Sequence, residues 1–573
     1  MKKIERSFIM KKRILALFLV LVMLTLTSCT TLVGLSSDRQ FLQNALVADQ
    51  ELDLSKDPLY DFDERIGAQI EDRFEILDEI LEKNSLFRYF NFLELYNQQM
   101  GDIFYLSDQA NLAFITYCMD TSKEKAFEDY QNLSELYTDH STRMIRMYRT
   151  IHESIFGFLF FSSMDGAEVD ELLTLSDSYS DEIVELIKER DDYVQEYQTL
   201  TYAQYDNEYL EQSAELYEKI VKCNNQIAVA AGYENYADYA YEMVYARDYS
   251  TDDAKELHKM VKEHIVPLSN TLNSRLTRMT ADPFKTSQVG EKIEMLRSPA
   301  SLSSVSTSTK MDQYYDHLDS FGGSREKLAY QQWKDEAFVC SVYDDYKTHN
   351  TYQAAFTTAL RYYNKPVCYH GYGYNNLSTY IHEQGHYAAF FKTPSGYESL
   401  DLCEVHSQGN EWLFYSYMDN EILFDDIYDY TISYILFEQT IYFVLSAACD
   451  SFEQYVYEHP ELTAKDYDDV FDRCVEELGA TKLLEENLSM DPSDYWHQAI
   501  VGNSMYYISY AVSLVPSIEL FVLSKDNYED AAKTYFALSE YEYDVGFAKA
   551  LEGAGLSSPF DEEVYVKIKE YFA

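Results

Sequence analysis

Apolar residues recur at helical spacing along most of the chain after residue 60. Leu, Ile, Phe and Tyr alternate there with charged residues at intervals of three and four, which is typical of half-buried helices. The clearest stretches lie at 66–96, 123–161, 209–231, 252–276, 428–458, 464–478 and 493–523. Two short runs, 337–342 and 366–374, have the best strand character. The pattern predicts a mainly α-helical protein with a small β element.

The N-terminal 60 residues follow a different pattern. A basic cluster at 11–13 precedes the apolar run 14–26, as in a secretory signal. The letters LTSC that end at Cys29 resemble the lipobox of bacterial lipoproteins, which implies cleavage before Cys29 and lipidation of that residue. We therefore predict a signal peptide at 1–28 and a polar tether at 29–60, with a plain signal peptide or an uncleaved anchor as alternatives. No later stretch is expected to span a bilayer.

Composition and charge exclude several classes of function. The chain has 98 acidic and 46 basic residues, and its formal net charge of -52 would repel a nucleic-acid backbone. The same charge opposes electrostatic docking to anionic lipids. The 8 cysteines are scattered and form neither a C-x-x-C metal pattern nor a compact disulfide framework. We predict a folded, acidic, monomeric body with no nucleic-acid partner.

One stretch carries a metal-binding pattern. His382-Glu383-Gln384-Gly385-His386 lies within 376–391, which reads as a helix that ends before Pro394. Residues four apart lie on one helical face, so the two imidazoles can share one metal ion. Glu383 lies beside that face, where a carboxylate can take a proton from a metal-bound water. The pattern predicts zinc ligands at His382 and His386 and a general base at Glu383.

Two histidines and a water leave a tetrahedral zinc ion one protein ligand short. The segment 397–415 is predicted to form a second helix that packs on the first. Glu404, 18 residues after His386, is a candidate for the third ligand; Glu411 and His406 are its rivals. Asp401 lies one helical turn before Glu404, where it is placed to accept the free ring N–H of a ligand histidine.

These two segments resemble the zinc motifs of the thimet oligopeptidase and oligoendopeptidase F family of zinc peptidases. That family carries H-E-[FL]-G-H and then a segment like D-x-x-E-x-P-S-Q-x-x-E, which supplies the glutamate ligand. This chain has HEQGH and then DLCEVHSQGNE at 401–411. It departs from the pattern at His406, where proline is usual, and in the short interval between the motifs. The resemblance implies one zinc per chain, held by His382, His386 and Glu404, with Glu383 as the base.

A later segment, 496–513, resembles the histidine and tyrosine cluster of the same family. That cluster faces the zinc and hydrogen-bonds the developing oxyanion. His497 and Tyr510 fit it best, and Tyr506 and Tyr507 are spaced so that either could share the face of Tyr510. We therefore predict catalytic roles for His497 and for one of these tyrosines. The resemblance covers roughly 230–520 and is specific only at the zinc motifs.

The resemblance implies a bilobed helical zincin of the gluzincin type. It would have a helical N-terminal lobe at 61–250, a catalytic lobe at 251–573 and a deep groove between them. We predict a zinc metalloendopeptidase that cuts short peptides and is lipid-anchored on the extracytoplasmic face of the cell membrane. One alternative is a lipid-anchored peptide-binding surface protein with a vestigial zinc site. Another is a zinc peptidase of a different gluzincin type with the same ligands.

Overall fold

The computed structural model describes residues 52–572, with gaps at 55, 62–64, 163, 165, 201–206, 299–304, 337–350, 353, 393–398, 422–424 and 540–544. The predicted signal peptide, Cys29 and most of the predicted tether lie outside the described residues. The predicted strand at 337–342 also lies outside them. Those predictions stay untested by the fold.

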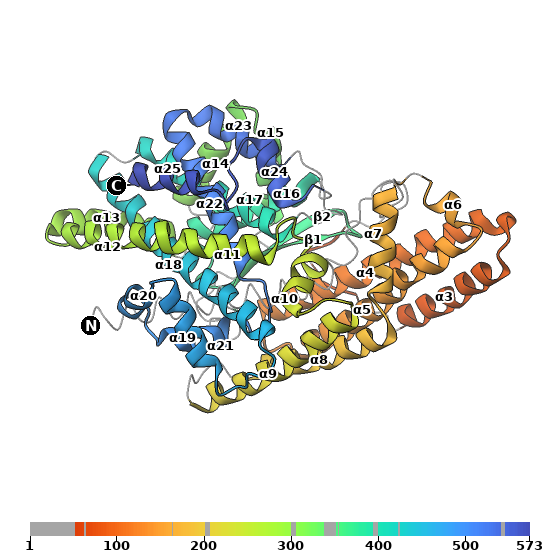
Figure 1. Cartoon of the computed structure of the whole chain (residues 1–573). Coiled ribbons are helices and arrows are strands. Elements are labelled where there is room, and N and C mark those ends of the chain that lie inside the picture. The colour runs from red at the N-terminus through yellow and green to blue at the C-terminus, as the bar shows by residue number, and fades with distance from the viewer. Residues whose placement is uncertain are drawn as a thin grey trace.

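The described chain begins with a layer of helices, most of them long (Figure 1). They are α3 (Arg65–Lys83), η2 (Leu86–Arg88), α4 (Tyr89–Met119), α5 (Glu124–Glu153), α6 (Gly157–Phe160), α7 (Gly166–Asp177), α8 (Asp181–Thr199) and α9 (Asn207–Ala230). Helix α5 shows why these segments are helical. Its buried residues include Tyr130, Leu133, Tyr137, His140, Met144 and Tyr148, which recur at three- and four-residue intervals and form one stripe. That stripe packs on α4, so the period in the sequence becomes the helix interface.

The second group of helices surrounds the segment that carries the zinc motif. Before the motif come α10 (Tyr236–Tyr239), η3 (Ala240–Val244), α11 (Thr251–Met260), η4 (Val261–Ile265), α12 (Val266–Met279), α13 (Pro283–Arg297), α14 (Val305–Ser320) and α15 (Ser324–Glu336). The motif helices are α16 (Leu377–Lys392) and α17 (Leu400–Tyr417). After them come η6 (Met418–Glu421), α18 (Asp425–Glu458), α19 (Tyr467–Glu477), α20 (Thr481–Asn487), η7 (Pro492–Asp494), α21 (Trp496–Ala499), α22 (Ile508–Asp526), α23 (Tyr528–Leu538), α24 (Phe547–Ala554) and α25 (Glu562–Phe572).

A two-stranded antiparallel hairpin lies between the two groups of helices (Figure 1). Strand β1 (Ala355–Leu360) pairs with β2 (Lys365–His370), and Phe356 lies opposite Tyr369 while Thr357 lies opposite Cys368. Successive side chains of a strand point to opposite faces. Phe356 and Tyr369 join the core of the N-terminal helices, and the Thr357 pair faces the motif helix α16.

Two clusters of buried hydrophobic residues make up the interior. One cluster comes from residues 54–179 together with one face of the hairpin. The other comes from residues 183–572. The predicted boundary between lobes at 250 stays a prediction, and the two buried clusters meet near residue 180. Helices α8 and α9 therefore contribute mainly to the core around the motif helices. The predicted mainly helical fold with a small β element is confirmed.

Among the described residues, two helices are long and apolar enough to cross a membrane by length and composition alone. They are Ile427–Glu458 within α18 and the whole of α22. Most of each apolar window, 72% and 78%, is buried inside the fold, as in the core helices of large helical proteins. The sequence analysis predicts no stretch after the N-terminal segment that is apolar enough to span a bilayer, whereas these two helices pass that test by length and composition.

Candidate metal centre

Helices α16 and α17 approach closely because residue 385 is glycine. A Cβ atom at 385 would lie 2.4 Å from the carbonyl oxygen of His406 and 2.7 Å from the Cα of Ser407. Only a residue without a side chain permits this contact. The Asn410 side chain adds a hydrogen bond across the interface, because its Nδ2 donates to the carbonyl of Ile381 at 2.7 Å. The contact places the Glu404 face of α17 against the histidine face of α16.

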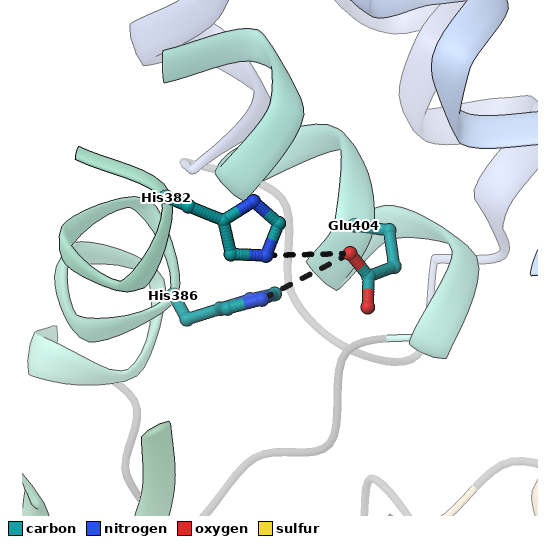
Figure 2. Close-up of side chains that lie close together, drawn as sticks. All are labelled: His382, His386 and Glu404. Atoms are coloured by element: carbon teal, nitrogen blue, oxygen red, sulfur yellow. Dashed lines mark ion pairs between the residues drawn. The ribbon is translucent and has the colours of Figure 1, made fainter. Parts of the chain in front are cut away.

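The three predicted ligands come together at this contact (Figure 2). The Nε2 atoms of His382 and His386 each lie 3.9 Å from Oε2 of Glu404. The three ligand atoms lie within 4.8 Å of one another. Zinc bonds of about 2.0–2.1 Å place neighbouring ligand atoms about 3.4 Å apart in a tetrahedron. Two imidazole nitrogens and one carboxylate oxygen in this arrangement therefore fit a zinc ion and leave its fourth position open.

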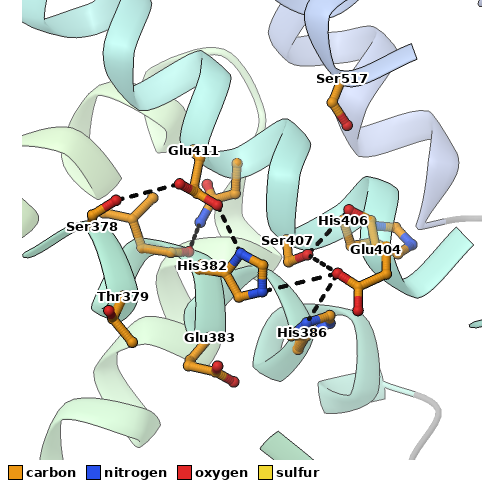
Figure 3. Close-up of polar contacts among 12 residues, drawn as sticks. Ser378, Thr379, His382, Glu383, His386, Glu404, His406, Ser407, Glu411 and Ser517 are labelled. Carbon is orange, nitrogen blue, oxygen red and sulfur yellow. Dashed lines mark hydrogen bonds and ion pairs between the residues drawn. The ribbon is translucent and has the colours of Figure 1, made fainter. Parts of the chain in front are cut away.

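The rival ligand Glu411 holds His382 from the other side of the ring (Figure 3). Its Oε1 lies 2.7 Å from Nδ1 of His382, so Nδ1 carries the proton and Nε2 is left to face the metal position. The Tyr415 hydroxyl donates to Oε2 of Glu411 at 2.7 Å, and the Ser378 hydroxyl lies 3.3 Å from the same oxygen. Glu411 thus takes the orienting role that the sequence had given to Asp401.

The predicted base, Glu383, is fixed by the hairpin. The Thr357 hydroxyl of β1 donates to Oε2 of Glu383 at 2.8 Å, and only 3% of Glu383 is exposed. Burial raises the pKa of Glu383 to about 7, although His382 and the Thr357 hydrogen bond act in the opposite direction. A carboxylate with such a pKa can both accept and release a proton near neutral pH.

The two histidines have different protonation tendencies. Burial opposes protonation of His382, but Glu411, Glu383 and Glu404 outweigh it and raise the pKa of this imidazole to about 9. Burial and the neighbouring His382 hold the pKa of His386 well below its usual value. Burial raises the pKa of Glu404. Three carboxylates surround the two imidazoles, and this negative charge would stabilise a divalent cation. The cation would displace the proton on Nε2 of His382, while the proton on Nδ1 stays with Glu411.

The three predicted tyrosines divide into two groups. Tyr506 and Tyr510 are buried, and their rings lie 5.4 Å apart between centroids. Burial, with a contribution from Glu404, raises the pKa of both phenols well above its usual value. Tyr510 raises the pKa of Tyr506 further, whereas Tyr506 acts in the opposite direction on Tyr510. The Tyr506 hydroxyl interacts with Glu404 and with Tyr510, but neither hydroxyl has a hydrogen bond of standard geometry among the described residues. Tyr507 packs its ring against Tyr510, 5.8 Å away between centroids, but its hydroxyl interacts with Tyr495.

His497 is not brought to the ligands. Its Nδ1 lies 2.7 Å from the Ser213 hydroxyl, and its Nε2 lies 3.1 Å from Oδ1 of Asp468. Its ring stacks on Trp496 with centroids 3.8 Å apart. Both ring nitrogens are therefore engaged in a buried network on α9 and α19, and the predicted oxyanion role finds no support in the geometry. This corrects the interpretation based on resemblance.

Asp401 also has other partners. Its Oδ2 accepts a hydrogen bond from the Tyr249 hydroxyl at 3.0 Å and lies 3.6 Å from Nε of Arg247. The ring of His386 hydrogen-bonds the backbone of Cys403 instead. His406, the other rival ligand, packs its ring against Tyr535. The prediction that Asp401 orients a ligand histidine is therefore replaced by Glu411 for His382 and by a backbone carbonyl for His386.

Thr357 was missed by the sequence analysis. It lies 26 residues before Glu383, in a strand that the pattern did not predict. Nothing in the local sequence of β1, AFTTAL, indicates that the Thr357 hydroxyl will meet the carboxylate of Glu383. Only the pairing of β1 with β2 places it beside α16.

Known proteins resemble this chain at the level of the fold. No family model matches the sequence, and no curated protein is significantly similar to it. Solved structures are similar in fold. PZ peptidase A with an inhibitor superposes with a TM-score of 0.69 at 18% identity, over 91% of this chain and 99% of that one. The chain shares the fold of these helical peptidases.

Two further structures extend the comparison. Oligoendopeptidase F from Enterococcus faecium has a TM-score of 0.53 at 14% identity, over 94% of this chain and 97% of that one. Metallocarboxypeptidase 1 from Trypanosoma cruzi has a TM-score of 0.54 at 12% identity, over 87% and 99% of the two chains. These likenesses bear out the predicted helical fold.

Proposed function

We propose that this protein is a zinc-dependent metalloendopeptidase, which cleaves short peptide substrates at internal peptide bonds. The observation that carries the proposal is the convergence of His382, His386 and Glu404, whose ligand atoms lie within 4.8 Å of one another. Glu383 lies beside them on the same helix. The fold shared with oligopeptidases and a metallocarboxypeptidase gives further support.

The zinc ion, when bound, supplies a Lewis acid that polarises the scissile carbonyl and lowers the pKa of a water molecule. Glu383 accepts the proton of the attacking water at a carboxylate oxygen and delivers it to the leaving amine. Thr357 keeps that carboxylate in place through its 2.8 Å hydrogen bond. Glu411 keeps Nε2 of His382 free by holding the proton on Nδ1, at 2.7 Å.

Two phenols suit the developing oxyanion. The Tyr506 and Tyr510 hydroxyls are buried near Glu404 without a partner of standard geometry among the described residues. A buried donor without a partner is destabilising in the resting state. It becomes favourable when the scissile oxygen gains charge, which is the arrangement that stabilises a transition state. We assign this role to Tyr506 and Tyr510 and not to His497 or Tyr507.

The substrate class is an inference from the similar folds, which include both endopeptidases and a carboxypeptidase. We favour internal cleavage. A peptide with a blocked amino terminus and an amidated carboxyl terminus separates the two activities. Cleavage of such a peptide supports the endopeptidase. Turnover of only the peptide with a free carboxylate supports a carboxypeptidase.

The decisive experiment uses the chain that lacks residues 1–29, purified beside the Glu404→Ala and Glu383→Gln variants. We expect about one zinc per chain in the parent and in Glu383→Gln, and little zinc in Glu404→Ala. We expect Glu383→Gln to lose peptide cleavage by about 10²–10⁴-fold, because the base is gone and the metal stays. A parent that binds peptide and zinc without cleaving would instead support the peptide-binding alternative.

The location is a separate proposal, supported by the basic and apolar segment that precedes Cys29. The protein is placed on the extracytoplasmic face of the membrane by a lipid on that cysteine. Cys29→Ser is expected to stop incorporation of a labelled fatty acid into the protein. The variant should then be absent from the membrane fraction of the cells. Equal labelling of the variant and the parent would overturn the anchor.

A further inference from the structure

The turn that leads into α22 has an unusual backbone at Met505. Its φ is +62°, in the left-handed region that residues other than glycine seldom adopt. Tyr506 follows directly, and Tyr510 lies in the first turn of α22. The direction of both phenols therefore depends on how the backbone at Met505 is held.

Glu453 of α18 holds the amide of Met505. The N–H of Met505 donates to Oε1 of Glu453 at 2.7 Å. The glutamate is 0% exposed, so its carboxyl group faces the interior of the protein and not solvent. A buried acid is costly unless it forms a specific hydrogen bond. The catalytic steps proposed above do not use this group.

Arg247 holds the other side of the same residue. Its Nη1 donates to the carbonyl of Met505 at 3.0 Å, and its Nη2 donates to the Ser509 hydroxyl at 3.1 Å. The guanidinium stacks on Tyr241 and Tyr245, 4.3 and 4.4 Å from their ring centroids. Its side chain is 0% exposed, so it is fixed within the core.

Neighbouring contacts tie this turn to the ligand helix. The Tyr245 hydroxyl donates to the carbonyl of Ser504 at 2.7 Å. Nε of Arg247 lies 3.6 Å from Oδ2 of Asp401, which is one helical turn before Glu404 on α17. The same arginine thus contacts both the tyrosine turn and the helix that carries the third ligand.

We propose that Arg247 and Glu453 are positioning residues that aim the Tyr506 and Tyr510 hydroxyls at the metal centre. They act through the backbone of Met505, whose N–H and C=O they bind from opposite sides. The two phenols have no hydrogen bond of standard geometry in the described chain, and Tyr506 has only looser contacts with Glu404 and Tyr510. The backbone of the turn is therefore the main restraint on their direction. This inference rests on the proposed peptidase function, in which these hydroxyls stabilise the oxyanion.

The test compares two substitutions at one position in the full chain. Glu453→Gln keeps an oxygen that accepts from the Met505 N–H, whereas Glu453→Leu removes it. Glu519→Leu is the matched control, because Glu519 is a buried glutamate of α22 that accepts from the N–H of Ser557 at 2.7 Å, outside the tyrosine turn. All three proteins are assayed for zinc content, thermal unfolding, and kcat and KM on one peptide.

We expect Glu453→Leu to lower kcat by about 10²-fold, because small displacements of a catalytic donor have effects of that size. Its zinc content and KM should match the parent. Glu453→Gln should restore most of kcat, and Glu519→Leu should lower the unfolding temperature without lowering kcat. Equal kcat losses in Glu453→Leu and Glu519→Leu would overturn the proposal, since they would reflect general destabilisation.

A double-substitution cycle links the effect to the tyrosines. In a Tyr506→Phe/Tyr510→Phe background, Glu453→Leu should cause no further loss of kcat, because the hydroxyls that it aims are absent. A loss as large as in the parent would overturn the proposal. If Glu453→Leu does not fold, Arg247→Lys replaces it in this cycle, since lysine keeps the buried charge and cannot bind both Met505 and Ser509.

A readout without catalysis separates this inference from the proposed function. Fluorotyrosine placed at position 510 should give one narrow ¹⁹F resonance in the parent and in Glu453→Gln. Glu453→Leu should broaden or split it. A resonance unchanged in Glu453→Leu would overturn the positioning role even in an active enzyme. A parent that cleaves no peptide but shows the expected spectra would overturn the peptidase proposal alone.

Discussion

The carboxylate of Glu411 determines how His382 presents Nε2 to the proposed metal position. It lies 2.7 Å from Nδ1 of His382 and is itself held by Tyr415. An anionic partner makes the opposite nitrogen a better ligand, and its loss commonly weakens metal binding by about 10–100-fold. We therefore expect Glu411→Gln to retain zinc at saturation and to release it more readily to a competing chelator.

The control for Glu411 is another carboxylate–imidazole pair. Asp468→Asn alters the contact between Oδ1 of Asp468 and Nε2 of His497, 3.1 Å apart, at a place that holds no predicted ligand. Its zinc affinity should equal that of the parent. Complete loss of zinc from Glu411→Gln would make Glu411 a ligand, contrary to the role assigned here.

His370 provides a pH-dependent contribution to stability. It ends β2 and packs between Trp333 and Tyr380, with ring centroids 5.8 and 4.9 Å away. Burial lowers the pKa of His370 to about 3. Between pH 3 and 6.5 the unfolded chain binds a proton that the folded chain does not, so stability falls as the pH is lowered through this window.

The expected size of the His370 effect is about 2 kcal/mol between pH 6.5 and pH 5. His370→Phe keeps a ring against Trp333 and Tyr380 and removes the titrating group. Urea unfolding at both pH values should therefore show a smaller loss of stability in the variant than in the parent. The same pH dependence in both proteins would contradict the assignment to His370.

Residues of the site differ in how visible they are in the sequence. His382, Glu383 and His386 were found because their relation is local and follows from helical geometry. Asp401 and His497 were assigned wrong partners, since the carboxylate meets Arg247 and the imidazole meets Ser213, both far away along the chain. Nothing in the spacing of either residue indicates which distant side chain the fold will bring to it.

At the scale of elements, the contact between α16 and α17 is the most sensitive feature. Gly385→Ala would place a methyl group 2.4 Å from the carbonyl oxygen of His406. Both atoms belong to rigid helices, so the helices must separate. Overpacking of this kind typically destabilises by about 1–3 kcal/mol. We expect a lower midpoint of urea unfolding and weaker zinc binding, because the ligands come from both helices.

Gly290 is the matched control for this substitution. It lies inside α13, where an added Cβ would meet nothing within 4 Å. Alanine there should stabilise the protein by about 0.4–1 kcal/mol, through higher helix propensity and a less flexible unfolded chain. If Gly385→Ala and Gly290→Ala shift the unfolding midpoint alike, close packing at Gly385 is not the cause.

The pattern predicted helices better than the elements between them. Strand β1 was missed because both of its faces are buried, so its residues do not alternate between apolar and polar. The stretch 493–523 was read as one helix, but the chain forms α21, a turn at 500–507 and then α22. Gly502 and Asn503 were the signal for that turn, and the apolar residues around them obscured it.

At the scale of the whole molecule, the hairpin joins regions that are distant along the chain. The Asp108 carboxylate of α4 accepts the N–H groups of Arg361 and Tyr363 in the hairpin turn, at 3.0 and 3.2 Å. Thr357 of the same hairpin holds Glu383. The N-terminal helices therefore support the position of the proposed base. The periodicity of apolar residues in the sequence does not indicate this connection, because the connection depends on a strand pair that is buried on both faces.

The net charge of -52 also acts on the whole molecule. Mutual repulsion among carboxylates destabilises a compact state, and salt screens it, since the Debye length falls from about 30 Å at 0.01 M to about 10 Å at 0.1 M. Exposed ion pairs such as Arg143 with Asp78, 3.0 Å apart, are weakened by the same salt, but each contributes little. Acidic residues outnumber basic ones by 98 to 46, so repulsion should dominate.

We expect the midpoint of thermal unfolding to rise between 10 mM and 300 mM NaCl and to rise equally with tetramethylammonium chloride, which also screens charge. A midpoint that falls with both salts would show that attractive pairs outweigh the net charge.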